Sequence, residues 1–150
     1  MKRSQRIQVI VDLKADQEQK ALQSLGKYQR EHQEMVTQIE HLTKYRQEYL
    51  DKFNSQSNAG LTIHQLQEFR AFANKLDTAI AGQEKSLKEL AEKLSKKRKI
   101  WLLAHQKTNS LQKVQHSALQ TEQIQIEKRE QKDQDERSSR SGRSSGMDDA

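Results

Sequence analysis

The feature that most constrains this chain is a hydrophobic repeat of 3.5 residues, maintained over most of its length. Alternate steps of four and three residues from Ile7 reach fourteen positions up to Phe53, and ten of them are apolar. The same walk from Leu66 to Ala118 reaches sixteen positions, of which twelve are apolar. In the whole chain only 32% of residues are hydrophobic. A repeat sustained over this length is typical of a coiled coil.

The composition agrees with a coiled coil and argues against a globular core. No proline interrupts the chain, and charged residues make up 32% of it. Disordered chains have a similar composition, but they lack a sustained heptad pattern. The chain has no cysteine, so disulfides and thiol chemistry are excluded and a reducing compartment is expected.

A polar segment separates the two repeats and predicts that the chain turns back on itself. Residues 54–60 are rich in Asn, Ser and Gly, which favour turns. Thr62 then suits the N-cap of a second helix, and Gln65 suits the reciprocal position of a capping box. We therefore predict an all-α fold, a long antiparallel two-helix coiled coil (α-hairpin).

The predicted hairpin domain covers residues 1–137, followed by a disordered tail at 138–150 that is rich in Ser, Arg and Gly. A helix over about 7–54, a loop at 55–62 and a helix over about 63–132 make up the domain. Because the second helix is longer, it is expected to run past the first from about Asn109. This overhang carries apolar residues that have no partner helix.

The pairing register can be predicted from the polar residues in the seam. A short loop favours partners whose residue numbers add up to 115, and this register pairs polar seam residues with one another. It also places two cations opposite aromatic rings, in positions for cation–π contacts. The predicted pairs are His32–Gln83, Glu18–Lys97, Lys14–Trp101 and Arg46–Phe69.

A slip of one heptad gives the competing register, in which partner numbers add up to 122. This register leaves Lys97 against Leu25, and it leaves Gln83 against Ile39. Burial of an unpaired ammonium group costs several kcal/mol. The register with a sum of 115 is therefore the predicted one.

Two aromatic residues near the turn lie beside the seam. Tyr45 and Phe72 occupy g positions, which face each other in an antiparallel coil, and Gln38 and Ala79 form the next such pair. Together with the edges of neighbouring seam residues they form a partly exposed apolar surface, here called the tip flank: Gln38, Leu42, Tyr45, Tyr49, Phe72, Leu76 and Ala79. Such patches mark protein-binding sites, although wide aromatic rings also simply thicken a core.

The net charge of +6 is concentrated in the second repeat. Residues 63–132 carry 14 basic and 8 acidic side chains. The densest group, here called the basic cluster, is Lys93, Lys96, Lys97, Arg98 and Lys99. It suits phosphate or an acidic protein surface; a solvated helix face paired with Glu89 and Glu92 is the alternative.

The sequence lacks the patterns that catalysis or cofactor binding requires. Its five histidines show no metal-ligand spacing, its five glycines are isolated, and a two-helix coil has no cavity for chemistry. We expect no enzyme activity and no cofactor. Nucleic acid is not an expected partner, because no aromatic residues are interleaved with the charges. No segment approaches the roughly 20 apolar residues of a membrane span, so a cytoplasmic protein is expected.

Several of these features together resemble the flagellar FliJ family of the bacterial type III export apparatus. They are the antiparallel coil, Tyr45 and Tyr49 before the turn, the run Phe72-x-x-x-Leu76-x-x-Ala79-Ile80 after it, and Trp101 further along. The resemblance covers roughly residues 1–130.

The resemblance implies a stalk, similar to that of rotary ATPases, whose open end enters and activates the hexameric export ATPase. That end comprises residues around Ile7–Lys20 and the second helix from about Lys97, and the expected ring-binding residues are Lys14, Lys93, Lys96, Lys97, Arg98, Lys99 and Trp101. The family's contact with the cytoplasmic domain of the export gate maps to the tip flank. The resemblance also implies export chaperones as partners, and a location at the inner face of the cell membrane through the apparatus.

Other functional classes remain open at this point. The equivalent stalk of a virulence type III secretion system shares the same architecture. A generic coiled-coil scaffold would self-associate through the overhang and leave ATPases unaffected. A nucleic-acid binder would lose affinity steeply with salt.

Overall fold

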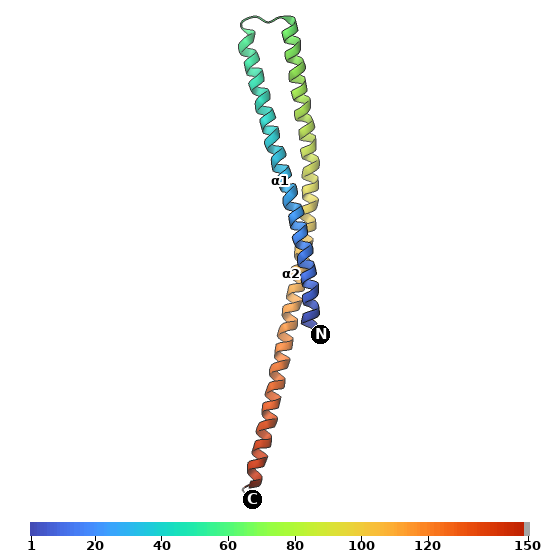
Figure 1. Cartoon of the computed structure of the whole chain (residues 1–150), viewed down its shortest axis with the longest axis vertical. Helices are drawn as coiled ribbons and strands as arrows, with labels where there is room; N and C mark the ends of the chain where they lie inside the picture. Colours follow the sequence, from blue (N-terminus) through green and yellow to red (C-terminus); the bar gives the residue numbers. More distant parts are fainter. Residues whose placement is uncertain (149–150) are drawn as a thin grey trace. The chain divides into compact units, whose positions relative to one another are not determined.

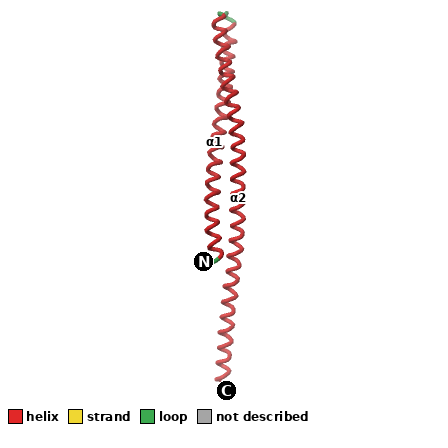
Figure 2. The backbone as a smooth tube through the Cα atoms, turned by 90° about the vertical axis from the view of Figure 1, so that its right-hand side faces the viewer, coloured by secondary structure: helices red, strands yellow, loops and turns green. Residues whose placement is uncertain are grey.

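The computed structural model describes residues 1–148 and contains two helices. Helix α1 covers Arg3–Ser57, and α2 covers Ile63–Asp148. They run in opposite directions on either side of a loop at 58–62 (Figure 1). Figure 2 shows helix on both sides of this loop and no strand in the part of the chain that the structure describes. The predicted all-α hairpin is confirmed.

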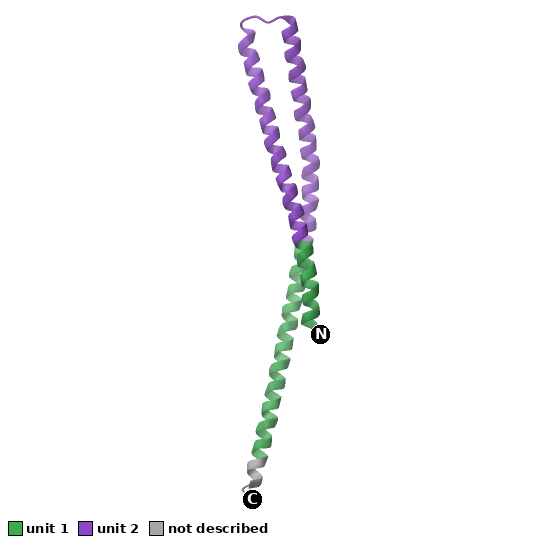
Figure 3. Ribbon diagram, viewed as in Figure 1, with its two compact units in different colours: residues 1–18, 104–150 green, residues 19–103 purple. Residues whose placement is uncertain are grey.

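The chain divides into two compact units (Figure 3). The hairpin unit is residues 19–103, which contain the loop and the helix segments on either side of it. The terminal unit pairs residues 1–18 of α1 with α2 from residue 104 onward.

The loop and the start of α2 are set by local backbone chemistry. Gly60 has a φ of 85°, a conformation that costs glycine little, and it follows the end of α1 at Ser57. The Gln65 amide N–H donates to Thr62 Oγ1 over 3.2 Å, and the Thr62 amide N–H donates to Gln65 Oε1 over 3.1 Å. The predicted capping box is therefore confirmed.

The predicted seam is confirmed along both helices. None of its fourteen positions on α1 and none of its sixteen positions on α2 is exposed. The most deeply buried apolar residues all belong to it: Val11, Leu25, Leu76, Leu90, Leu94 and Ala118. Each is less than a tenth exposed, although a coil of two helices has only one line of contact.

The predicted register is wrong by one heptad. In the hairpin unit Arg46 pairs with Asp77, and Phe53 stacks on Phe69, so partner numbers add up to 122 or 123. In the terminal unit the contacts Glu18–His105 and Gln8–Gln115 give a sum of 123. Helix α1 ends three residues later than predicted, which shortens the loop and moves its centre along the chain.

The expected penalty of this register is avoided at Lys97 but not at Gln83. The Lys97 Nζ lies 5.6 Å from the centre of the Tyr28 ring, so the flexible lysine stem places its ammonium group against an aromatic ring instead of leaving it unpaired against Leu25. Gln83 Oε1 is buried and accepts no hydrogen bond within residues 1–148. The predicted His32–Gln83, Glu18–Lys97 and Arg46–Phe69 pairs are therefore replaced.

Two further boundaries differ from the sequence-based expectation. The interhelical contacts extend to Ser4–Glu122, so the overhang of α2 begins beyond Glu122 instead of near Asn109. Helix α2 also continues to Asp148 through the segment expected to be disordered from Ser138. This segment contains no proline, and serine and arginine are compatible with helix. Residues 149–150 lie outside the described range.

A seam substitution should destabilise the hairpin far more than a substitution on its outer face. We expect Leu90→Ala to lower the free energy of unfolding by about 2–3 kcal/mol, because it removes a side chain that is 8% exposed. Leu103→Ala, at a position that is 60% exposed, should change it by less than about 0.5 kcal/mol. Urea unfolding followed by circular dichroism measures both, and similar losses would contradict the assigned seam.

Candidate protein-binding surfaces

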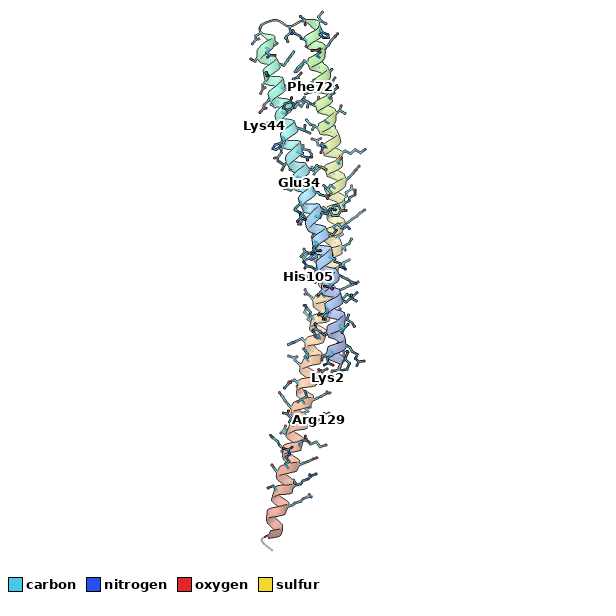
Figure 4. All side chains as sticks on the ribbon, viewed as in Figure 1. Lys2, Glu34, Lys44, Phe72, His105 and Arg129 are labelled. Atoms are coloured by element: carbon cyan, nitrogen blue, oxygen red, sulfur yellow. The ribbon has the colours of Figure 1, made fainter. Side chains whose placement is uncertain are left out.

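An aromatic cluster lies next to the loop in the hairpin unit. Phe53 and Phe69 stack with their ring centres 3.6 Å apart, and Tyr49 stacks on Phe69 at 5.1 Å. Phe72, marked in Figure 4, meets Tyr49 edge-on at 4.6 Å and Tyr45 edge-on at 6.3 Å. The cluster fixes one surface in place because each ring is held by at least one other.

The tip flank is only partly assembled as predicted. Tyr45 is half exposed and contacts Phe72, as the sequence indicated. Leu76 is 7% exposed, so it supports this surface from within the seam instead of contributing area to it. Gln38 lines a groove with Ser86, seven residues beyond its expected neighbour Ala79. The changed register explains this separation.

The groove beside Gln38 lies on the same side of the hairpin unit. Its volume is about 400 Å³, and it has an apolar floor with mostly polar and charged side chains around it. The floor is formed by Met35 and Leu90, and the remaining lining residues are Glu31, Glu34, Gln38, Ser86, Glu89 and Lys93. The residues contributed by the two helices confirm the observed register.

The basic cluster is a solvated cationic surface. Lys93, Lys96, Arg98 and Lys99 are exposed, and Lys97 is partly covered. Within residues 1–148 none of these five forms an ion pair, so Glu89 and Glu92 do not neutralise them. Ile100 and Leu103 nearby are 52% and 60% exposed. Sequence reasoning overlooked these two apolar residues because it assigned only seam and g positions near the loop.

The two remaining residues of the predicted ring-binding set lie in different units. Lys14 belongs to the terminal unit, where its Nζ donates to Gln17 Oε1 over 3.4 Å. Trp101 belongs to the hairpin unit and is partly buried at a seam position.

The terminal unit contains a polar layer that the sequence did not indicate. Glu18 Oε1 lies 2.6 Å from His105 Nδ1, and Asn109 Nδ2 lies 3.2 Å from His105 Nε2 (Figure 4 marks His105). The hydrogen bond with His105 holds the pKa of Glu18 below its ordinary value, against the opposing effect of burial. Thr108, which is 3% exposed, also lowers this pKa through a hydrogen bond.

A second polar contact joins the N-terminus of α1 to α2. The amide N–H of Ser4 donates to Glu122 Oε1 over 3.1 Å, and its hydroxyl donates to Oε2 over 2.7 Å. These bonds lower the pKa of the Glu122 carboxyl. A carboxylate from α2 thus caps the helix terminus of α1, where unpaired amides favour negative charge.

The cationic side chains of Lys2, Arg3 and Arg129 lie around the same end of α1. With Ala118, Ile126 and Glu122 they line a groove of about 470 Å³ in the terminal unit. Glu122 is already hydrogen-bonded to Ser4, which leaves the three cations as the charged groups that can meet a partner. Sequence reasoning missed this site because the heptad pattern does not show where α1 begins.

The comparisons with known proteins give one match. Residues 2–146 match the protein family described as Flagellar FliJ protein. The chain belongs to the FliJ family. The match spans nearly the whole chain and confirms the resemblance seen in the sequence. Neither curated proteins nor solved structures give a match.

Membership of the FliJ family, a family of export components without enzymatic activity, relates the chain to flagellar protein export. Residues 1–148 contain no group of three or more His, Cys, Asp or Glu that could hold a metal ion. Neither helix, within the same range, has an apolar stretch of the length that a membrane span requires.

The two lowered carboxyl pKa values predict the direction of acid destabilisation in this FliJ-family chain. Both groups are stabilised as carboxylates in the fold, so their contribution is complete above the ordinary pKa of about 4.5. It is lost as pH falls through the lower pKa of the folded state.

Thermal unfolding between about pH 2 and 6 tests this effect with the variant Glu18→Gln. This variant should be less stable than the unchanged chain near pH 6, and it should lose less stability as the pH falls. Glu130→Gln, at an exposed position of α2, is the matched control and should leave the profile unchanged. An unaltered profile for Glu18→Gln would contradict the assigned role of the Glu18–His105 contact.

Proposed function

We propose that this FliJ-family chain is the stalk of the flagellar type III export apparatus. The open end of its coil binds the ring of the export ATPase and promotes ATP hydrolysis, and the tip flank binds the cytoplasmic domain of the export gate. Export chaperones are further proposed partners. These contacts are made in the cytoplasm at the inner face of the cell membrane, which the chain reaches only through the apparatus.

The observation that carries this proposal is the presence of two chemically different surfaces on one stiff hairpin. Tyr45 and Phe72 offer a half-exposed aromatic surface near the loop, while the basic cluster offers unpaired cations further along α2. From Phe72 to Lys99 the helix rises by about 40 Å. A single small partner does not need two such surfaces, but an adaptor between two large assemblies does.

The chemistry of each surface suits its proposed partner. Aromatic side chains on a preformed support are the common anchors of protein interfaces, because they bury much area at a small cost in conformational entropy. Exposed ammonium groups interact weakly and at longer range, and salt screens them. Weak charge contacts allow a stalk to bind a ring without being fixed in one orientation. The groove lined by Lys2, Arg3 and Arg129 adds cations of the same kind.

The basic cluster is tested by charge reversal. We expect Lys93→Glu/Lys96→Glu/Lys99→Glu to raise the concentration that gives half-maximal stimulation of the same organism's export ATPase by about ten-fold or more. Gate binding, measured by calorimetry, should remain within about two-fold of the unchanged chain. Stimulation that does not respond to this change would remove the basic cluster from the proposed ring contact.

The tip flank is tested by Tyr45→Ala/Phe72→Ala. Loss of two aromatic anchors should weaken gate binding by about a hundred-fold, while ATPase stimulation stays intact. Ile63→Ala is the matched control, because Ile63 also lies near the loop and is 77% exposed. Equal loss of both activities would show that the two surfaces do not act separately and would contradict the proposal.

One observation favours a second function, that of a self-associating scaffold. Ile124 and Ile126 lie beyond the end of the paired region and are 51% and 39% exposed. Sedimentation of the full chain distinguishes the two functions: a scaffold forms dimers that Ile124→Asn/Ile126→Asn disrupts, without an effect on any ATPase.

A stalk of a virulence system would stimulate that system's ATPase in preference to the flagellar one.

A further inference from the structure

We propose that α1 slips along α2 by one heptad, so that the hairpin has a second register in which partner numbers add up to 115. Seven residues correspond to a shift of about 10 Å. Because the repeat has the same period, the slip returns every seam position to the seam. Apolar burial therefore does not select one register, and the polar residues and the loop decide between the two. This inference goes beyond the proposed function and does not depend on it.

Gln83 favours the second register. In the observed register its Oε1 is buried and accepts no hydrogen bond from the described residues. A buried acceptor without a partner is costly. A sum of 115 places Gln83 opposite His32, whose ring can donate to it. The observed register thus contains a local defect that the second one repairs.

Contacts in the terminal unit favour the observed register: Glu18 pairs with His105, and Glu122 accepts two hydrogen bonds from Ser4. A slip of α1 separates these partners.

Two contacts near the loop favour the same register. Phe53 stacks on Phe69, and Arg46 pairs with Asp77. The side chains of this ion pair are 34% and 51% exposed, so its contribution is small. The observed register is therefore the major one, and the second is the minor one.

The loop gives the slip a direction. The last turn of α1, residues 54–57, is exposed throughout and can unwind into the loop while Gly60 and the capping box of α2 stay in place. A slip in the opposite direction has to extend α1 through Gly60 at its φ of 85° and break the capping box. Only the slip toward a sum of 115 is compatible with these signals.

The slip changes the surface of the hairpin unit. In the observed register Gln38 and Ser86 line the same groove. In the second register Gln38 faces Ala79, so the two outer members of the tip flank become neighbours. Phe53 at the same time loses Phe69 as its partner. One sequence would thus present two versions of the surface near the loop.

Thiol cross-linking tests the proposal, because the chain has no cysteine of its own. Gln38→Cys is combined in turn with Ser86→Cys, Ala79→Cys or Lys93→Cys, all at exposed positions. The Ser86→Cys combination reports the observed register. Ala79 and Lys93 lie one heptad to either side of Ser86, so general loosening of the coil would cross-link both combinations equally. A short bis-maleimide is applied to dilute protein, intramolecular products are quantified by mass spectrometry, and circular dichroism verifies that each variant is helical.

We expect the Gln38→Cys/Ser86→Cys variant to give the highest yield of cross-link. The combination with Ala79→Cys should give a smaller yield that clearly exceeds the yield with Lys93→Cys. In the Ala79→Cys variant, the further change Asp77→Asn removes the ion pair with Arg46 and should raise the yield by up to about five-fold.

The further change Gln83→Leu removes the buried acceptor and should lower the yield of the Ala79→Cys variant. Equal yields from the Ala79→Cys and Lys93→Cys variants would overturn the proposal. So would a yield from the Ala79→Cys variant that neither Asp77→Asn nor Gln83→Leu changes.

Discussion

The structure depends, in each of its two units, on a line of side chains buried between two helices. Residues 1–148 form no second layer, so a residue among them either belongs to this seam or lies beside it. The fourteen and sixteen seam positions supply all of the deeply buried apolar residues. Everything else on the chain, including the aromatic surface near the loop and the basic cluster, is held in place by this seam. That arrangement gives a binding protein a stiff support with little core.

The seam was predictable from the sequence because burial leaves a period of 3.5 residues in it. The capping box of Thr62 and Gln65 was also predictable, because it depends on local spacing alone. The Tyr45–Phe72 contact was predicted from the other register, and it is present although the register changed. The register of the two helices was not predictable in this way. A slip of one heptad keeps every apolar residue in the seam, so the choice between registers depends on a few polar contacts and on the last turn of α1.

The other differences between the predicted and the observed contacts also concern polar side chains. A lysine opposite Leu25 was expected to be too costly to bury, but the side chain is long enough to place its ammonium group over the Tyr28 ring. The Glu18–His105 and Ser4–Glu122 contacts join residues far apart in sequence, and no heptad rule pairs them. Because Gln38 changed its neighbour with the register, the predicted tip flank was correct at Tyr45 and Phe72 but not at its outer end.

Family membership and surface chemistry together lead to the stalk proposed here. Its central claim is that a single hairpin serves a whole ATPase ring, and native mass spectrometry of the assembled complex tests this most directly. We expect one chain bound to each ring of ATPase subunits, since the proposed stalk enters the ring at its centre. A complex with one chain on every ATPase subunit would contradict it, because such a stoichiometry describes a protein that decorates the outside of the ring.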